Sequence, residues 1–166
     1  MIKTKEEAIN AIKENDKDEE FYDYELFKSK EFDLFRDDKE VALKAIENSS
    51  NSLRYCSDRL KDDEEVILYA IDRGRSSFEY ASDRLRDNKE LVMEAIKKDG
   101  SVIVYASKRL KDDEETVLKA IEYDMHGIDY ASDRLKDDNN FIFKAVELQI
   151  TSLNYLSDEW KDNKDL

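Results

Sequence analysis

Apolar residues fall in short groups at helical spacing along most of the chain. One such group is Val66, Ile67, Ala70 and Ile71, whose spacings of three and four residues place its members on one face of a helix. Leu68 widens that face. The pattern predicts a helix over 62–73.

A second apolar group follows after a short polar break. Phe78, Ala81 and Leu85 are spaced for one face of another helix, which we expect to begin near Ser76 or Ser77 and to end at Leu85. Helices of about 18 and 14 Å follow from these lengths, and neither is long enough to be stable alone in water. The two helices should therefore form a hairpin that buries its apolar faces against neighbouring hairpins.

This hairpin recurs every 25 residues. Ala returns at 45, 70, 95, 120 and 145, Tyr at 55, 80, 105, 130 and 155, and Ser at 57, 82, 107, 132 and 157. The register predicts long helices near 38–48, 62–73, 87–98, 112–123 and 137–148. Hairpins stacked in this way form a solenoid. We therefore expect an all-α protein, a right-handed α-solenoid, with five repeats over 37–166 in a single domain.

A carboxylate pair marks the start of most predicted long helices. The pairs are Asp37/Glu40, Asp62/Glu65, Asp87/Glu90 and Asp112/Glu115. A spacing of three residues is that of a capping box, in which the first side chain accepts a hydrogen bond from a backbone N–H of the first helical turn, worth about 1 kcal/mol. The first Asp of each pair is therefore the predicted cap.

The two ends of the chain depart from the register. The stretch from Thr4 to Glu7 should open a helix that ends near Asn15. An aromatic segment follows, with Phe21, Tyr22, Tyr24, Phe27, Phe32 and Phe35. We expect residues 1–36 to form an N-terminal capping unit, with an exposed aromatic binding patch as the alternative. The last hairpin either caps the array or belongs to a longer array cut at Leu166.

One unit of the repeat resembles a known family. Residues 37–71 read DDKEVALKAIENSSNSLRYCSDRLKDDEEVILYAI, an Asp-Lys-Glu…Ala-Ile helix followed by a Leu-x-Tyr-x-Ser-x-x-Leu helix. This pattern, over about residues 36–166, resembles the family known as domain of unknown function 4116, in which Cys56 and Leu156 replace the usual Ala and Trp160 the usual Leu. The resemblance implies short helical-hairpin arrays of bacterial and large-virus proteins. It implies no activity and transfers no residue role.

Composition excludes several classes of protein. Proline is absent and glycine occurs three times, so residues that break helices are scarce. The chain has no run of 18 apolar residues, no apolar signal core near its start and one cysteine, which together predict a cytoplasmic protein without a membrane span. The formal net charge of −14 disfavours direct binding to nucleic acids and to anionic membranes.

Candidate catalytic residues are few. His126, the one histidine, stands in the register of residues that favour helix N-caps, namely Asn51, Ser76, Ser101 and Thr151. A loop or cap position is therefore expected, because a general base would need a nucleophile and an orienting group beside it. Cys56 replaces an Ala and should be buried and unreactive. We predict that the protein is not an enzyme.

No metal site or cofactor is expected either. The run Asp16-x-Asp18-x-Glu20 comes nearest to a calcium loop, but it lacks the glycine at the sixth position and has Phe27 where a bidentate Glu is needed. The other acidic runs, such as 62–65, lie at predicted helix starts, where the helix dipole favours carboxylates.

Tyr and Arg form a ladder with the same period. The pairs, each four residues apart, are Tyr55/Arg59, Tyr80/Arg84, Tyr105/Arg109 and Tyr130/Arg134. A pair that returns in every unit usually solves a packing problem that also returns. We expect the hydroxyl or the guanidinium to reach carboxylates of the adjacent unit, and a peptide-binding ladder is the alternative.

Exposed positions that vary between repeats are the candidates for a partner-binding surface. On the shorter helix, positions 54 and 58 and their equivalents read Arg54/Asp58, Glu79/Asp83, Val104/Lys108, Asp129/Asp133 and Asn154/Asp158. If this helix lines the concave side, these residues form one stripe. Val104 and Lys108, flanked by Glu79, Asp83, Asp129 and Asp133, are the predicted contact centre for a largely basic protein partner. Drift without function is the alternative.

Three functions fit these observations. The leading hypothesis is a non-catalytic scaffold that binds a protein partner along its groove. The second is an acidic decoy that occupies a nucleic-acid-binding site of another protein, supported by the charge of −14 but weakened by the 28 Lys and Arg residues. The third is a structural segment of a longer repeat array.

Overall fold

The computed structural model of the 166-residue chain describes residues 2–15 and 27–152. Within these two ranges all regular structure is helical, as predicted, and no strand occurs. The chain divides into two compact units, Met1–Leu91 and Val92–Leu166. The boundary between them falls inside helix α7 (Lys89–Lys98), and each unit is therefore described by itself.

The elements follow one another in a repeating order of long α-helix, 3-10 helix and short α-helix. The first unit contains α1 (Lys5–Asn15), η1 (Lys30–Phe35), α3 (Lys39–Asn48), η2 (Ser50–Tyr55), α4 (Asp58–Lys61), α5 (Glu64–Ile71), η3 (Arg75–Tyr80) and α6 (Asp83–Arg86). The second unit contains η4 (Gly100–Tyr105), α8 (Lys108–Lys111), α9 (Glu114–Tyr123), η5 (Met125–Tyr130), α10 (Asp133–Lys136) and α11 (Asn139–Ser152).

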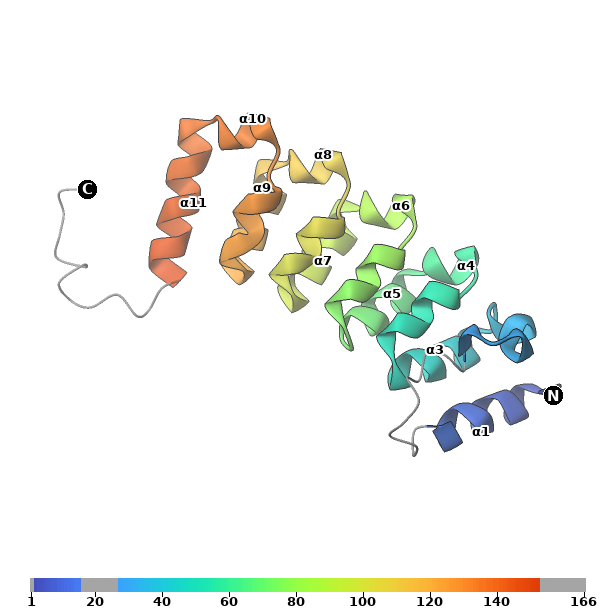
Figure 1. Ribbon diagram of the computed structural model, residues 1–166. Coiled ribbons are helices and arrows are strands. Elements are labelled where there is room, and N and C mark those ends of the chain that lie inside the picture. The colour runs from blue at the N-terminus through green and yellow to red at the C-terminus, as the bar shows by residue number, and fades with distance from the viewer. Residues whose placement is uncertain (1, 16–26, 153–166) are drawn as a thin grey trace. The chain divides into compact units, whose positions relative to one another are not determined.

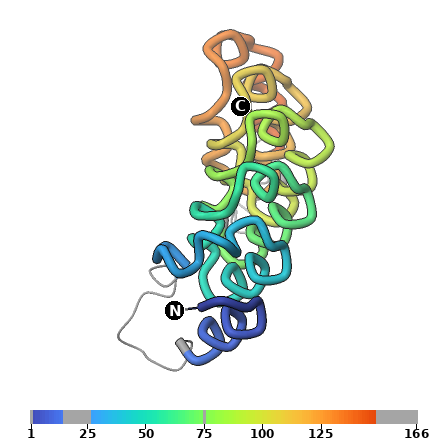
Figure 2. The backbone as a smooth tube through the Cα atoms, turned by 90° about the vertical axis from the view of Figure 1, so that its right-hand side faces the viewer, coloured from blue at the N-terminus to red at the C-terminus, as the bar shows by residue number. Residues whose placement is uncertain are grey.

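The long helices start at intervals of 25 residues, at 39, 64, 89, 114 and 139. Within each unit they lie side by side, α3 against α5 and α9 against α11 (Figure 1). The 3-10 helices form a second row, in which η2 contacts η3 and η4 contacts η5. The tube in Figure 2 shows the chain running out and back once in every repeat. Each short α-helix ends directly before the next long helix and so lies at that helix's N-terminal end.

The predicted second helix of the hairpin is wrong in one respect: it is two helices. In the repeat that contains Phe78, η3 ends at Tyr80 and α6 begins at Asp83. Between them Ala81 and Ser82 are extended, and Ser82 caps α6 by accepting a hydrogen bond from the Leu85 N–H at 3.2 Å. A serine cap stabilises a new helix start, which a periodicity of apolar residues cannot reveal.

The predicted helix caps are wrong by one residue. Asp63, rather than Asp62, precedes α5, and its Oδ1 accepts hydrogen bonds from the N–H groups of Glu65 (3.1 Å) and Val66 (3.2 Å). Asp38, Asn88, Asp113 and Asp138 precede the other long helices, and each accepts a hydrogen bond from the backbone N–H three residues further on. A capping box forms at α1, where Thr4 and Glu7 exchange two hydrogen bonds of 3.2 Å.

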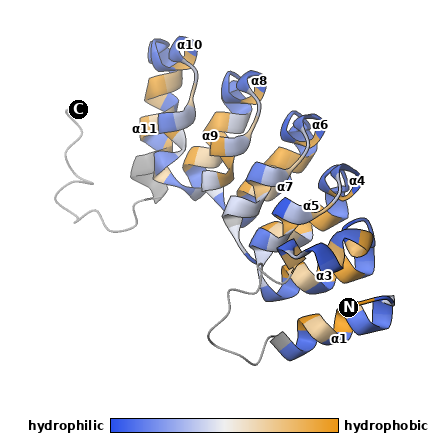
Figure 3. Ribbon diagram, turned by 45° about the vertical axis from the view of Figure 1, so that its right-hand side comes forward, coloured by the Kyte–Doolittle hydropathy of each residue, from blue (hydrophilic) through white to orange (hydrophobic). Residues whose placement is uncertain are grey.

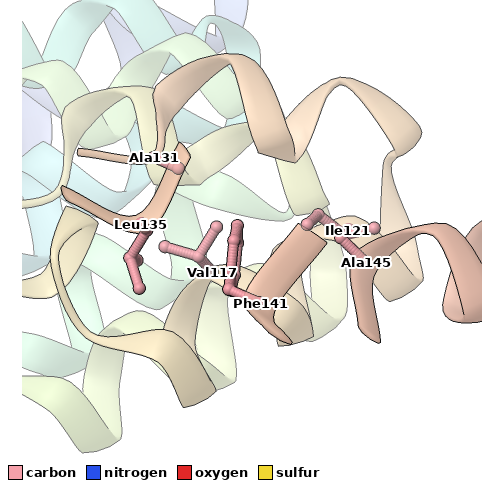
Figure 4. Close-up of a cluster of buried hydrophobic side chains, with 6 residues drawn as sticks. All are labelled: Val117, Ile121, Ala131, Leu135, Phe141 and Ala145. Carbon is pink, nitrogen blue, oxygen red and sulfur yellow. The ribbon is translucent and has the colours of Figure 1, made fainter. Parts of the chain in front are cut away.

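The core lies between consecutive long helices and the 3-10 row. In the second unit, α9, α10 and α11 enclose a buried cluster that consists of Val117, Ile121, Ala131, Leu135, Phe141 and Ala145 (Figure 4). Hydrophobic and hydrophilic residues alternate along the long helices (Figure 3), and the buried residues of α9 include the hydrophobic Val117, Ala120 and Ile121. Ala95 and Ala120 are both 0% exposed, which confirms their predicted burial.

A close approach of η5 to α9 explains one glycine. A Cβ on Gly127 would lie 2.8 Å from the backbone nitrogen of Ile121 and 3.0 Å from the Ala120 Cβ. Atoms at those distances overlap, so the 3-10 helix could not sit this near the long helix with a larger residue. Small residues also occupy this register in the first unit, where Ser52 and Ser77 are buried.

Three residues of the N-terminal aromatic segment belong to the core. Phe27, Phe32 and Phe35 are 1%, 0% and 8% exposed. Their rings meet edge to face, with centroids 5.6 Å apart for Phe27 and Phe32 and 6.5 Å for Phe32 and Phe35, an arrangement that aromatic pairs prefer. The alternative of an exposed aromatic patch is therefore wrong for these three, while Phe21, Tyr22 and Tyr24 lie outside the described residues.

Across the part of the chain that the structure describes, none of the helices has the length and apolar character needed to cross a bilayer.

Candidate protein-interaction surface

Consecutive repeats are joined at one edge by a set of polar bonds, which we call a rung. In the rung at Asp62, the carboxylate accepts hydrogen bonds from the Ser82 hydroxyl and from Arg84 Nε, the latter at 3.0 Å. Arg84 Nη2 also donates to the Asp62 carbonyl at 2.9 Å, and the Ser82 N–H donates to the Lys61 carbonyl at 2.9 Å. Each rung thus ties the start of a short helix to the end of the preceding one.

The same rung recurs in both units. In the first unit a second rung links Asp37 to Ser57 and Arg59, and in the second unit a rung links Asp112 to Ser132 and Arg134, with Nε–Oδ1 distances of 2.9 Å in both. The serine hydroxyl, and after it the arginine, lowers the pKa of each rung aspartate below its ordinary value. The structural interpretation of the arginine ladder is therefore confirmed for these rungs.

One register position departs from this pattern. Asp137 is the counterpart of Asp112 at the end of α10 and is exposed. Its side chain has no hydrogen bond or ion pair among the described residues. In the sequence, the arginine register that would serve Asp137 is occupied by Glu159. The serine register is kept by Ser157, so Asp137 differs from the other rung aspartates in its arginine.

The predicted contact centre lies on two short elements rather than on one helix. Val104 is half-buried in η4, and Lys108 is exposed at the first residue of α8. The extended residues Ala106 and Ser107 separate them. The prediction that both residues lie on one helix is therefore wrong. Lys111 Nζ donates to the Val104 carbonyl at 2.6 Å, which holds α8 against η4.

The acidic residues expected to flank this centre divide between the units. Asp129 in η5 and Asp133 in α10 lie in the second unit, as Val104 does. The two aspartates are exposed, and η5 contacts η4, the helix that contains Val104. Glu79 and Asp83 are exposed in the first unit. Asp83 forms an ion pair with Arg86 of its own helix.

Comparison with known proteins addresses the repeat itself. The family model described as Domain of unknown function (DUF4116) matches residues 38–86, 88–136 and 126–161. The chain belongs to this family. Each of the first two matches spans about two repeats and begins near the start of a long helix. No curated protein and no solved structure matches the chain.

The one cysteine of this DUF4116 protein is a buried thiol. Cys56 is 4% exposed, and its Sγ lies 3.7 Å from the Ser52 carbonyl oxygen as a hydrogen-bond donor. Burial raises the pKa of the thiol to about 12. Because the thiolate is the reactive form, the predicted inert packing role fits this environment.

His126 lies in the first turn of η5 rather than at a cap. Its backbone N–H donates to Asp124 Oδ1 at 3.0 Å, so Asp124 is the capping residue. The exposed imidazole has Nδ1 3.6 Å from a carboxylate oxygen of Asp129. Among the described residues no three His, Cys, Asp or Glu side chains are grouped to hold a metal ion. Asp16, Asp18 and Glu20 fall outside those residues.

Tyr69 and Arg73, near the end of α5 in the first unit, were not among the predicted contact residues. Tyr69 is half-buried and Arg73 is exposed at the end of α5, four residues apart. The signal was present, because the register of Tyr69 reads Lys44, Glu94, Lys119 and Lys144 in the other DUF4116 repeats.

Proposed function

We propose that this DUF4116 protein is a non-catalytic, cytoplasmic scaffold that binds a protein partner. Its repeats would continue as one α-solenoid of 25-residue hairpins. The contact centre would be Val104 and Lys108 with the flanking acids Asp129, Asp133, Glu79 and Asp83, and the partner would be largely basic. The buried thiol of Cys56 fits a reducing compartment.

One observation supports this proposal above the others. The Asp, Ser and Arg residues that recur in the repeats are used in rungs between neighbours, whereas the exposed residues beside them differ from repeat to repeat. Residues that hold the array together cannot distinguish one partner from another. The varying positions can, and Val104 and Lys108 are the pair that interrupts an otherwise mainly acidic register.

The rungs also favour the scaffold over an acidic decoy. The carboxylates of Asp37, Asp62 and Asp112 are each matched by an arginine of the same protein. Those charges are satisfied internally and contribute less to an electrostatic imitation of nucleic acid.

The test starts from a photo-crosslink in cells of the source organism. A chain with p-benzoylphenylalanine in place of Lys108 should crosslink to one protein, and a chain with it in place of Lys97, which is exposed on α7, should not. The purified partner should bind the double variant Val104→Asp, Lys108→Glu at least tenfold more weakly, a loss of about 1.4 kcal/mol. Unchanged affinity would move the contact centre elsewhere.

A further inference from the structure

A groove with an apolar floor runs between α1 and α3 in the first unit. Its central recess of about 340 Å³ is lined by Ile9, Lys13, Glu40, Leu43, Lys44, Glu47 and Tyr69. A second recess of about 480 Å³ shares Ile9, Lys13 and Glu40 with it and extends along α1. Ile9 and Leu43 are half-buried, so the floor retains apolar surface that a ligand could cover.

Tyr69 and Arg73 form a preordered wall beside the recess. The Arg73 guanidinium lies over the Tyr69 ring, 3.4 Å from its centroid, and Arg73 Nη1 donates to the Tyr69 carbonyl at 3.0 Å. Tyrosine and arginine are the residues most enriched, with tryptophan, where binding energy concentrates in protein interfaces. A side chain that is already ordered also loses less entropy when a partner binds.

Positive charge exceeds negative charge at this end of the groove. Lys44 Nζ pairs with Glu47 at 2.5 Å. The hydrogen bond from Lys44, together with the charges of Arg73 and Lys13, lowers the pKa of Glu47. Lys13 has no hydrogen bond or ion pair with any other described side chain. Glu40, the other carboxylate of the lining, pairs with Lys5 at 2.6 Å. Lys13 and Arg73 therefore remain as cations without an ion pair among the described residues, in a chain whose net charge is −14.

We propose that this groove docks a short acidic segment of a partner protein. An apolar side chain of the segment enters the recess over Ile9, Leu43 and Tyr69, and carboxylates next to it pair with Lys13 and Arg73. The inference rests on the proposed role as a protein-binding scaffold. It names a second surface, of opposite chemical preference to that around Val104 and Lys108.

The test uses the full chain, ¹⁵N-labelled, and two synthetic 12-residue peptides. One carries Leu-Phe followed by four Glu, and the other has four Lys in place of the Glu residues. The acidic peptide should bind at least tenfold more tightly than the basic one. Its amide shift changes should centre on Ile9, Leu43 and Tyr69. The affinity should fall with added salt, because the pairing charges are exposed.

Variants separate the charge from the recess. The double variant Lys13→Glu, Arg73→Glu should weaken the acidic peptide at least tenfold, and Leu43→Asp should weaken both peptides. The matched control, Lys3→Glu with Lys97→Glu, makes the same change in net charge at exposed positions outside the groove and should leave the affinity within twofold.

Three results would overturn the groove proposal: binding of neither peptide, equal binding of both, or equal loss in the control double variant. Shift changes centred on Val104 and Lys108 would also overturn it while leaving the scaffold proposal intact. Conversely, if the acidic peptide binds in the groove but no protein crosslinks through position 108, the contact centre at Val104 and Lys108 would be wrong and the groove proposal would stand.

Discussion

The residues that form the rungs recur between repeats, whereas the residues at the neighbouring outward positions vary. The rung at Asp62 in the first unit and that at Asp112 in the second have the same partners, with Nε–Oδ1 distances of 3.0 and 2.9 Å. At the neighbouring register the acidic residues Glu79 and Asp129 stand on either side of Val104, so neither charge nor size is constant. Constancy along the chain therefore marks what a repeat needs from its neighbour.

The same contrast divides single helices. Phe141 and Phe143 lie two residues apart on α11, yet Phe141 is 1% exposed and Phe143 is 75% exposed. Phe141 contributes to the cluster around Val117, while Phe143 is not a member of that cluster. Position on the helix, rather than residue type, decides whether a side chain stabilises the repeat or is available to a partner.

The largest expected effect on stability comes from removing the buried side chain of Phe141. Phe141→Ala should lower the free energy of unfolding by about 3–5 kcal/mol, because the change removes a large buried side chain and leaves a cavity. Phe143→Ala, the matched control on the outward face, should change it by less than about 0.5 kcal/mol. Urea unfolding followed by circular dichroism measures both. Similar losses in the two variants would show that the faces of α11 are not distinct.

Placing a larger side chain at a buried alanine should lower the stability somewhat less. Ala95 is fully buried in α7, so Ala95→Leu should cost about 1–3 kcal/mol through overpacking and lower the melting temperature. Glu94→Leu adds a similar side chain at the exposed neighbouring position and serves as the control. A melting temperature unaffected by Ala95→Leu would mean that this register tolerates a larger residue.

The contribution of a rung should be smaller again. Asp62→Asn should lower the melting temperature by less than Ala95→Leu does, because the lost ion pair is exposed to solvent. Asp137→Asn, at the same register but with Glu159 in place of the arginine, should lower it less. Equal effects of the two substitutions would show that the rungs do not stabilise the array.

The rungs also predict a dependence on pH. The pKa of each rung aspartate is lower in the folded chain than its ordinary value of about 3.8. Their contribution to stability is therefore fully present above the unfolded-state pKa and is lost as the pH falls through the lower, folded-state pKa. Below about pH 4 the melting temperature should fall, and in Asp62→Asn it should fall less steeply. Parallel pH profiles would contradict this assignment.

The last prediction concerns the reactivity of a buried side chain, the Cys56 thiol, rather than the stability of the fold. Because burial raises the pKa of Cys56 to about 12, the native protein should react with iodoacetamide at pH 8 at least tenfold more slowly than the unfolded chain, whose thiol has a pKa of about 8.5. Mass spectrometry of the alkylated protein over time measures the two rates. Equal rates would place Cys56 at the surface.

Several features followed from the sequence because they depend on local or periodic chemistry. The period of 25 residues set the starts of the long helices to within about two residues, and the apolar spacing identified Ala95, Ala120 and Cys56 as buried. The Tyr and Arg ladder correctly predicted that a guanidinium reaches a carboxylate of the neighbouring repeat. These results share a cause, since each repeat solves the same packing problem with the same residues.

Other features were decided by contacts between repeats that spacing alone does not contain. The chain breaks at Ser82 because its N–H and hydroxyl bond to residues 61 and 62 of the preceding repeat, so the shorter helix becomes two. For the same reason Asp62 serves a rung and leaves the cap to Asp63. The groove over Ile9 and Leu43 exists only where α1 meets α3. A sequence pattern specifies which side chains a helix presents, but the partner of each polar group is settled only when two repeats meet.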